Sequence, residues 1–344
     1  MKKVYAGFDF AKVILAFFVV AIHIHPFEGM NNPFLDHLNT YLFSMAVPFF
    51  FAMTGHLLFQ KEGKLYEQSK RVRSYIWKTI KLYVFANVLY LPATFTGFRI
   101  WNIEPQYRLK VFVNEFLFVG EHYLSWPFWY LLATIYGLLV IYLLLKCHVP
   151  TVGILLVGMA SYRFSDVLSY WTSHLEMLSG WKLELATVAA QTVRTGRMFT
   201  SILFFAIGML LARMQCLKKA HWGIRLFSFL VVSAVYLLHP AGYVYMVGRP
   251  MMVFTGVWFL SSIQVQDCLL YHVLREFSLV LYVCHMLFQF IWTECTHNPS
   301  AGGWTPYWFA ICGCVLVTGI LVTRKEEWKR SREYAKSHSI NVRI

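Results

Sequence analysis

Charged side chains are scarce in this sequence of 344 residues, of which Asp, Glu, Lys and Arg make up only 14%. Soluble domains carry roughly 25%, and apolar residues here account for 58%. This composition excludes an ordinary soluble enzyme and predicts an all-α integral membrane protein that crosses a lipid bilayer many times. The formal net charge of +14 is then typical of cytoplasmic loops and not of nucleic-acid binding, for which no basic and aromatic module is present.

Several signatures of soluble enzymes are also absent. There is no Gly-x-Ser-x-Gly elbow, no Gly-Lys-Ser/Thr phosphate loop and no His-Glu-x-x-His helix. The seven cysteines match neither a zinc site nor a disulfide framework. We therefore expect no bound metal or cofactor, and neither a zinc mechanism nor nucleotide hydrolysis is supported. No internal repeat is visible, and the sequence says nothing about oligomeric state.

Apolar runs of membrane-spanning length recur along the whole chain. We predict about ten transmembrane helices, at residues 8–27, 39–59, 79–98, 127–145, 149–163, 196–213, 223–239, 244–263, 277–293 and 304–323. The mixed stretch 165–193 is predicted to be an outer loop with an interfacial helix or, alternatively, a further span.

Basic residues gather near 61–81, 213–225 and 324–343. With ten spans, all three clusters fall on the same side of the membrane as Lys2 and Lys3. The excess of Lys and Arg in cytoplasmic loops makes that side the cytoplasm, so both termini are predicted to be cytoplasmic. We expect a transmembrane domain over 1–323 and a basic cytoplasmic tail over 324–344.

The first apolar segment, Gly7–Phe27, carries the ionisable residues Asp9, Lys12, His23 and His25. Such groups are costly in a membrane span and are usually retained for a function. Eleven residues of helix make almost three turns and about 16 Å of rise, so Lys12 and His23 lie on one face, near opposite membrane surfaces. Because no small-x-small cleavage site follows, we expect a retained helix and not a signal peptide.

His23 is the predicted catalytic residue, because a neutral imidazole can accept a proton at ambient pH and serve as a general base. The alternative is a histidine that hydrogen-bonds a neighbouring helix. Lys12 is predicted to bind a phosphate or steer an anionic donor, or to form an ion pair with Asp9, three residues earlier. His25, which precedes Pro26, is expected to be structural.

Residues outside the first segment give further candidates. Lys78 and Lys81 lie one turn apart at the start of the third run, where two cations can hold a phosphorylated cosubstrate or extend to lipid phosphates. Arg194 opens the sixth run near the outer surface, where a substrate contact and an internal ion pair are comparable explanations. His285 in the ninth run and His122 before the fourth are weaker signals, and core packing is the better explanation for most such residues.

The order of these motifs resembles the membrane acyltransferase-3 family. Its members have a first helix in which ten residues separate a basic residue from a histidine, as in Lys12 and His23, with Lys here in place of the more usual Arg. The family's paired basic residues before the third helix are similar to Lys78 and Lys81, again with Lys for Arg. Further family-like segments are AVPFFFAMTGHLLF, FWYLLA, TGRMFTSILFFAIGMLLAR and SLVLYVCH, so the resemblance extends over about residues 5–323.

Two departures from the family pattern bear on function. Arg and Lys are not equivalent where one side chain binds two oxygens in a bidentate contact, so the replacements affect the expected affinity for the donor. Pro127 occupies the place where a histidine often precedes a Leu-Trp-Tyr-like motif of the fourth helix. Any role of that histidine is missing here unless His122 substitutes for it.

The resemblance implies transfer of an acyl group, usually acetyl, from a cytoplasmic acyl-CoA such as acetyl-CoA to a hydroxyl of an envelope glycan, lipid or small molecule in a bacterial cell membrane. The CoA phosphates would rest on the paired lysines and on Lys12. His23 would deprotonate the acceptor hydroxyl or receive the acyl group itself. Arg194, Tyr282 or His285 would contact the substrate or the developing oxyanion.

A transporter for a small polar solute such as an amino acid is the alternative, because intramembrane charges serve transport as readily as catalysis. The family resemblance also extends to membrane domains joined to serine racemases, for which amino-acid uptake has been suggested. The absence of repeated halves, which many transporters have, favours the acyltransferase. A purely structural membrane protein would leave Lys12 and His23 unexplained.

Overall fold

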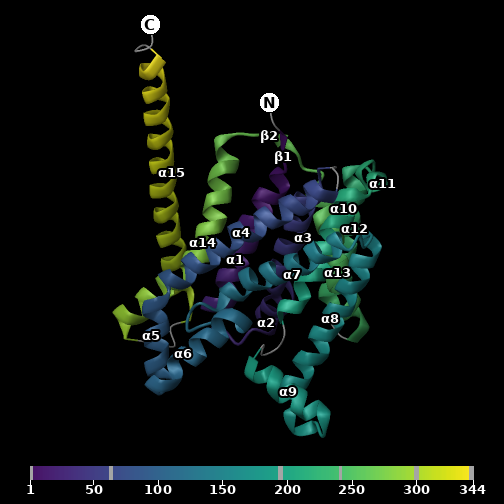
Figure 1. Cartoon of the computed structure of the whole chain (residues 1–344), viewed down its shortest axis with the longest axis vertical. Coiled ribbons are helices and arrows are strands. Elements are labelled where there is room, and N and C mark those ends of the chain that lie inside the picture. The colour runs from purple at the N-terminus through teal and green to yellow at the C-terminus, as the bar shows by residue number, and fades with distance from the viewer. Residues whose placement is uncertain (1–2, 62–64, 193–196, 240–241, 298–301, 341–344) are drawn as a thin grey trace. The chain divides into compact units, whose positions relative to one another are not determined.

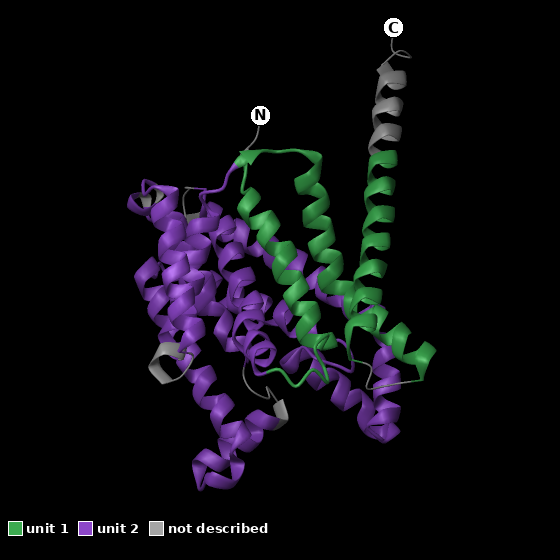
Figure 2. Cartoon of the chain, turned by 180° about the vertical axis from the view of Figure 1, so that it is seen from behind, with its two compact units in different colours: residues 1–32, 265–344 green, residues 33–264 purple. Residues whose placement is uncertain are grey.

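The computed structural model is almost entirely helical and describes residues 3–61, 65–192, 197–239, 242–297 and 302–340 (Figure 1). The chain divides into two compact units (Figure 2). Unit 1 consists of residues 1–32 and 265–344, and unit 2 consists of residues 33–264. The predicted all-α class is confirmed, because strand in the described ranges is limited to β1 (Lys3–Val4) and β2 (Val265–Gln266).

Unit 1 contains three long helices, α1 (Ala6–Ile24), α14 (Leu269–Thr296) and α15 (Trp304–Ile340). Strands β1 and β2 pair antiparallel immediately before α1 and α14 begin. These two helices pack along each other in the same direction, and α15 runs back along α14 (Figure 2). A first, a ninth and a tenth membrane span would alternate in direction in this way.

Helix α1 ends at Ile24, before the pair His25 and Pro26. His25 adopts a left-handed conformation with φ of 49°, and its N–H donates to the carbonyl of Ala21 at 3.0 Å. Pro26 follows and cannot continue the helix. The His25 carbonyl accepts a hydrogen bond from the Gly303 N–H at 3.0 Å, so His25 joins the end of α1 to the start of α15.

Unit 2 contains the remaining helices. They are α2 (Pro33–His37), α3 (Ala46–Phe59), α4 (Leu65–Leu89), α5 (Leu91–Ile100), α6 (Pro105–Asn114), α7 (Trp129–Lys146), α8 (Thr151–Ser173), α9 (Trp181–Thr192), α10 (Ser201–Arg213), α11 (Gln215–Lys218), α12 (Trp222–Leu238) and α13 (Gly242–Leu260). Short π-helical turns lie at Leu38–Leu42 and Glu115–Val119, and short 3-10 turns at Phe43–Met45, Trp126–Phe128, Leu175–Met177 and Arg197–Thr200.

The centre of unit 2 is the close pair α3 and α10, which is buried along almost its whole length. Two glycines let the backbones approach. A Cβ on Gly208 would lie 2.0 Å from the carbonyl oxygen of Ala52, and one on Gly55 would lie 2.4 Å from that of Phe205. Small residues at such crossings are typical of membrane helices, where packing and not water drives association.

Six helical stretches among the described residues are long and apolar enough to cross a membrane: residues 6–24, 33–59, 126–146, 151–173, 269–296 and 304–328. The predicted number of ten is therefore not confirmed. The run at 79–98 crosses the break between α4 and α5, and α10, with 13 residues, measures about 20 Å against roughly 30 Å of hydrocarbon. Helix α12 and residues 246–260 of α13 are apolar but also shorter.

Two other predicted boundaries differ from the structure. Helix α8 continues to Ser173, so the fifth run is longer than expected. The described part of the stretch that follows holds a short 3-10 turn and the 12-residue α9, which is about 18 Å long and too short for a further span. Helix α15 continues through residue 324 to Ile340, so the expected tail begins inside a helix.

Candidate functional site

Two histidines meet inside unit 1. The ring centroids of His23 on α1 and His285 on α14 are 5.7 Å apart, with 31° between the ring planes. His285 is completely buried, and His23 is half-buried. The sequence singled out both residues separately, and the packing of α1 against α14 brings them together.

The hydrogen bond made by His285 determines which of its ring nitrogens carries a proton. Nδ1 lies 2.6 Å from the carbonyl oxygen of Leu281, and a carbonyl only accepts, so Nδ1 must donate. In the neutral ring, Nε2 then carries the lone pair. This buried atom has no hydrogen-bond partner among the residues that the structure describes. The His23–His285 pair can therefore accept or relay a proton in an apolar environment.

A group of charges lies at the opposite end of α1, near β1 and β2. Asp9 is only 6% exposed and forms an ion pair with Arg275 of α14 at 3.4 Å. Arg275 also binds Asp267 at 3.0 Å. Lys12 is close enough to interact electrostatically with both Asp9 and Arg275. Asp9 is thus paired across two helices, which the predicted pairing with Lys12 alone did not include.

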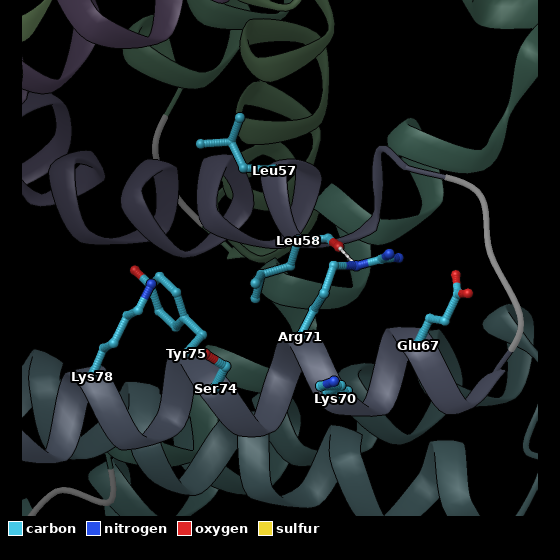
Figure 3. A pocket seen from close by; sticks show the side chains of 8 residues that line it. All are labelled: Leu57, Leu58, Glu67, Lys70, Arg71, Ser74, Tyr75 and Lys78. Atoms are coloured by element: carbon cyan, nitrogen blue, oxygen red, sulfur yellow. Dashed lines mark hydrogen bonds between the residues drawn. The ribbon is translucent and has the colours of Figure 1, made fainter. Parts of the chain in front are cut away.

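Unit 2 contains a cavity of about 520 Å³ between α3 and α4 (Figure 3). This volume lies within the range of roughly 300–1,000 Å³ that is usual for small-molecule sites. The cavity is lined by Leu57, Leu58, Glu67, Lys70, Arg71, Ser74, Tyr75 and Lys78. Three cations against one carboxylate make this lining basic.

The arginine of the cavity is held in place by backbone carbonyls. Arg71 Nε donates to Leu58 at 3.2 Å, and Nη2 donates to Lys61 at 2.8 Å. Lys78 extends from α4 beside Tyr75 (Figure 3). Lys81, one turn further on, is exposed and is not part of the lining. The predicted lysine pair is therefore divided, with one member in the cavity.

A second polar group in unit 2 lies between α6 and α7. Glu115 Oε2 and His122 Nδ1 are 2.8 Å apart, and both side chains are buried. Glu121 pairs with Arg197, whose guanidinium lies 5.0 Å from the centre of the Trp129 ring. His122, a weak signal in the sequence, is thus part of a buried carboxylate–imidazole pair.

Two predicted site residues remain, Tyr282 and Arg194. Tyr282 lies on α14, three residues before His285, and is buried. Arg194 lies outside the described residues.

Sequence reasoning missed several residues of these groups. Lys70 and Arg71 contributed only to the predicted membrane orientation, although their place beside Lys78 on one helix was a usable signal. Arg275 lies two residues before the ninth apolar run, where an ionisable residue also merits notice. Glu115 gave no signal, because Gly120 in a left-handed conformation (φ 77°) breaks the helix between it and His122.

Long apolar helices with buried ionisable groups define a multi-pass membrane protein with polar sites inside its helical units. Comparison with protein families matches residues 5–323 to the acyltransferase-3 model, described as an acyltransferase domain. Because this match extends over nearly the whole chain, the protein belongs to the acyltransferase-3 family, as the resemblance predicted.

Similarity to individual proteins is weaker. An amino-acid racemase of Enterococcus faecalis is 34% identical over 152 residues, which are 42% of this chain and 20% of that protein. A serine/alanine racemase of Enterococcus gallinarum is 28% identical over 254 residues, which are 70% of this chain and 33% of that protein. The chain thus spans between a fifth and a third of these relatives, so their names assign it no activity. No solved structure matches.

Proposed function

We propose that this membrane acyltransferase moves an acyl group, acetyl in the first instance, from a cytoplasmic acyl-CoA to a hydroxyl of an envelope glycan, lipid or small molecule. The protein would act in a bacterial cell membrane. The family membership supports the reaction class. The observation that carries the assignment of residues is the His23–His285 pair, because it places two imidazoles side by side in an apolar part of unit 1.

The basic cavity of unit 2 supports a phosphorylated donor. CoA carries several phosphate groups, and Lys70, Arg71 and Lys78 offer charge-assisted donors around one cavity. Arg71 is oriented by the carbonyls of Leu58 and Lys61, so part of the binding geometry is fixed before a ligand arrives.

His23 can act in either of two ways. As a general base, it takes the proton of the acceptor hydroxyl while the oxygen bonds to the thioester carbonyl carbon, and the C–S bond then breaks as the proton passes to the CoA sulfur. As a nucleophile, its nitrogen bonds to the thioester carbonyl carbon, the C–S bond breaks, and the N–H proton of the ring passes to the CoA sulfur. In a second step the hydroxyl oxygen takes the acyl group as the N–C bond breaks, and the hydroxyl proton returns to the imidazole. In both routes His285 acts beside His23, and Nε2 of His285 is available to hold a proton.

Thiol release from acetyl-CoA tests this function. Detergent-purified wild type, His23→Ala and a control, His174→Asn, would be compared with envelope extract as the source of acceptor. We expect the rate to fall by about 10²–10⁴-fold in His23→Ala and to stay unchanged in the control. Normal turnover by folded His23→Ala would remove His23 from the mechanism, and an inactive wild type would contradict the proposed donor.

A further inference from the structure

The buried pair Glu115–His122 has no part in the steps above. His122 is 2% exposed and Glu115 6%, and Glu115 Oε2 lies 2.8 Å from His122 Nδ1. The ring of Phe112 stacks on that of His122, with centroids 4.8 Å apart and 12° between the planes. The imidazole is therefore fixed on one edge by a carboxylate and on one face by an aromatic ring.

The opposite edge of the imidazole carries the second ring nitrogen, Nε2. His122 Nε2 is buried and has no hydrogen-bond partner among the described residues. Buried polar atoms are nearly always paired, and an unpaired one destabilises a fold. The protein thus retains, in an enclosed place, a polar atom that a ligand group can satisfy.

The backbone around the pair is also unusual. Glu115 begins a π-helical turn that ends at Val119, and such turns occur frequently at functional sites. Leu124 has a positive φ of 57°, which costs energy in a residue other than glycine. The N–H of His122 donates to the completely buried Ser125 Oγ at 2.8 Å. These features hold the imidazole in one orientation.

The charges define the chemistry of the missing partner. The carboxylate of Glu115 beside the imidazole disfavours the phosphates of an acyl donor, because like charges repel each other. The neighbouring cation Arg197 is already paired with Glu121. The carboxylate of Glu115 accepts a hydrogen bond from Nδ1–H of His122, which leaves Nε2 of the neutral ring as an acceptor. A hydroxyl group can donate to Nε2.

We propose that His122, held by Glu115, binds a hydroxyl group of the neutral acyl acceptor and so determines which acceptor is used. This inference rests on the acyltransferase function proposed above. A site built to hydrogen-bond a hydroxyl rejects molecules without it, because the buried imidazole would then stay unpaired. His122 is accordingly assigned to the recognition of acceptor and not to the donor.

Kinetics with both substrates test this assignment. Transfer of labelled acetyl from acetyl-CoA would be measured while the concentration of envelope extract is varied, in wild type and His122→Asn. The Asn amide can take the place of Nδ1 beside Glu115 but has nothing at the position of Nε2. We expect the apparent KM for the extract to rise about 10-fold or more and the KM for acetyl-CoA to stay within about 2-fold.

Two further variants make the result decisive. His174→Asn is the matched control, because His174 also stacks on an aromatic ring, that of Tyr170, but its Nδ1 contacts the backbone carbonyl of Tyr170 and not a carboxylate. Glu115→Gln is the second variant, to be used if His122→Asn fails to fold, because its side chain can still hydrogen-bond His122. It should raise the KM for the extract by about 3-fold or more.

Unchanged KM values in a folded variant would overturn the inference but leave the proposed acyltransferase function intact. Failure of wild type to label the extract would instead overturn the proposed function, and this inference with it.

Discussion

At the scale of single residues, the site depends on histidines whose partners come from distant parts of the sequence. His23 and His285 are separated by most of the chain, yet their rings lie 5.7 Å apart. Each alone has a simple structural explanation. Their proximity is different, because the buried Nε2 lone pair of His285 lies on a ring beside that of His23, where it can accept a proton during the reaction.

We predict that His285→Ala loses activity to a similar extent as His23→Ala, about 10²–10⁴-fold in kcat. The double variant should be no slower than His23→Ala by itself, because residues that act as a unit are not additive. Thiol release from acetyl-CoA by the three purified variants checks this. Losses that multiply in the double variant would show that the two histidines act independently.

The sequence predicted the identity of these residues better than their contacts. His23 follows from its place in an apolar span and from its spacing to Lys12. Arg275 could not be recognised as the partner of Asp9, because the pairing depends on the packing of α1 against α14. The Glu115–His122 pair depends on a π-helical turn and a left-handed Gly120, which no helical periodicity indicates.

At the scale of helices, the α3–α10 contact shows how small residues set the packing of unit 2. The Gly208 backbone faces that of Ala52 with no room for a side chain. The same α3 forms one wall of the basic cavity through Leu57 and Leu58. The position of this helix therefore influences both the stability of the unit and the shape of the site.

Gly208→Ala is predicted to destabilise the protein by about 1–3 kcal/mol, because the new Cβ would meet backbone atoms that cannot turn aside. Thermal unfolding in detergent should show a Tm lower by about 2–10 °C. Gly319→Ala in α15 is the control, since nothing lies within 4 Å of the added Cβ. Helix propensity alone favours alanine at both positions, so an equal lowering of Tm in the two variants would mean that the close crossing is not responsible.

Helix α4 permits a second comparison. Lys78 lines the cavity and Lys81 does not, although the sequence favoured both. We predict that Lys78→Ala raises the KM for acetyl-CoA by about 10-fold, because a charge-assisted contact with a phosphate is lost. Lys81→Ala should change it by less than about 2-fold. If the two variants behave alike, the cavity is not where the donor phosphates bind.

The sequence located most helices correctly but judged their lengths less well. Hydrophobic runs give the place of a helix, whereas its ends depend on local breaks such as the one at Tyr90 between α4 and α5. The run at 79–98 was continuous in composition and is divided in the structure. Conversely, α8 extends through polar residues as far as Ser173.

At the scale of the whole molecule, the sequence gives an orientation that the family match does not address. In unit 1, α1 and α14 are parallel and α15 is antiparallel to them, as expected for spans that alternate with both termini on one side. The basic clusters favour the cytoplasm for that side.

Exposed cysteines provide a test of this orientation. Cys147, Cys216 and Cys268 are predicted on the cytoplasmic side and Cys295 on the outer side, and all four are exposed. In intact cells that carry single-cysteine variants, a membrane-impermeant maleimide should label Cys295 alone. All four should react after lysis. Labelling of Cys216 in intact cells would contradict the ten-span orientation.

The central claim is acyl transfer that depends on His23, and reconstituted liposomes test it most directly. Labelled acetyl-CoA and envelope extract would be supplied to wild-type and His23→Ala protein, and ester-linked label in the extract would be measured. Uptake of labelled serine and alanine without acetyl-CoA would be followed in parallel. We predict ester label with wild type, none with His23→Ala, and no amino-acid uptake. Amino-acid uptake by wild type without any ester label would contradict the account and identify a transporter.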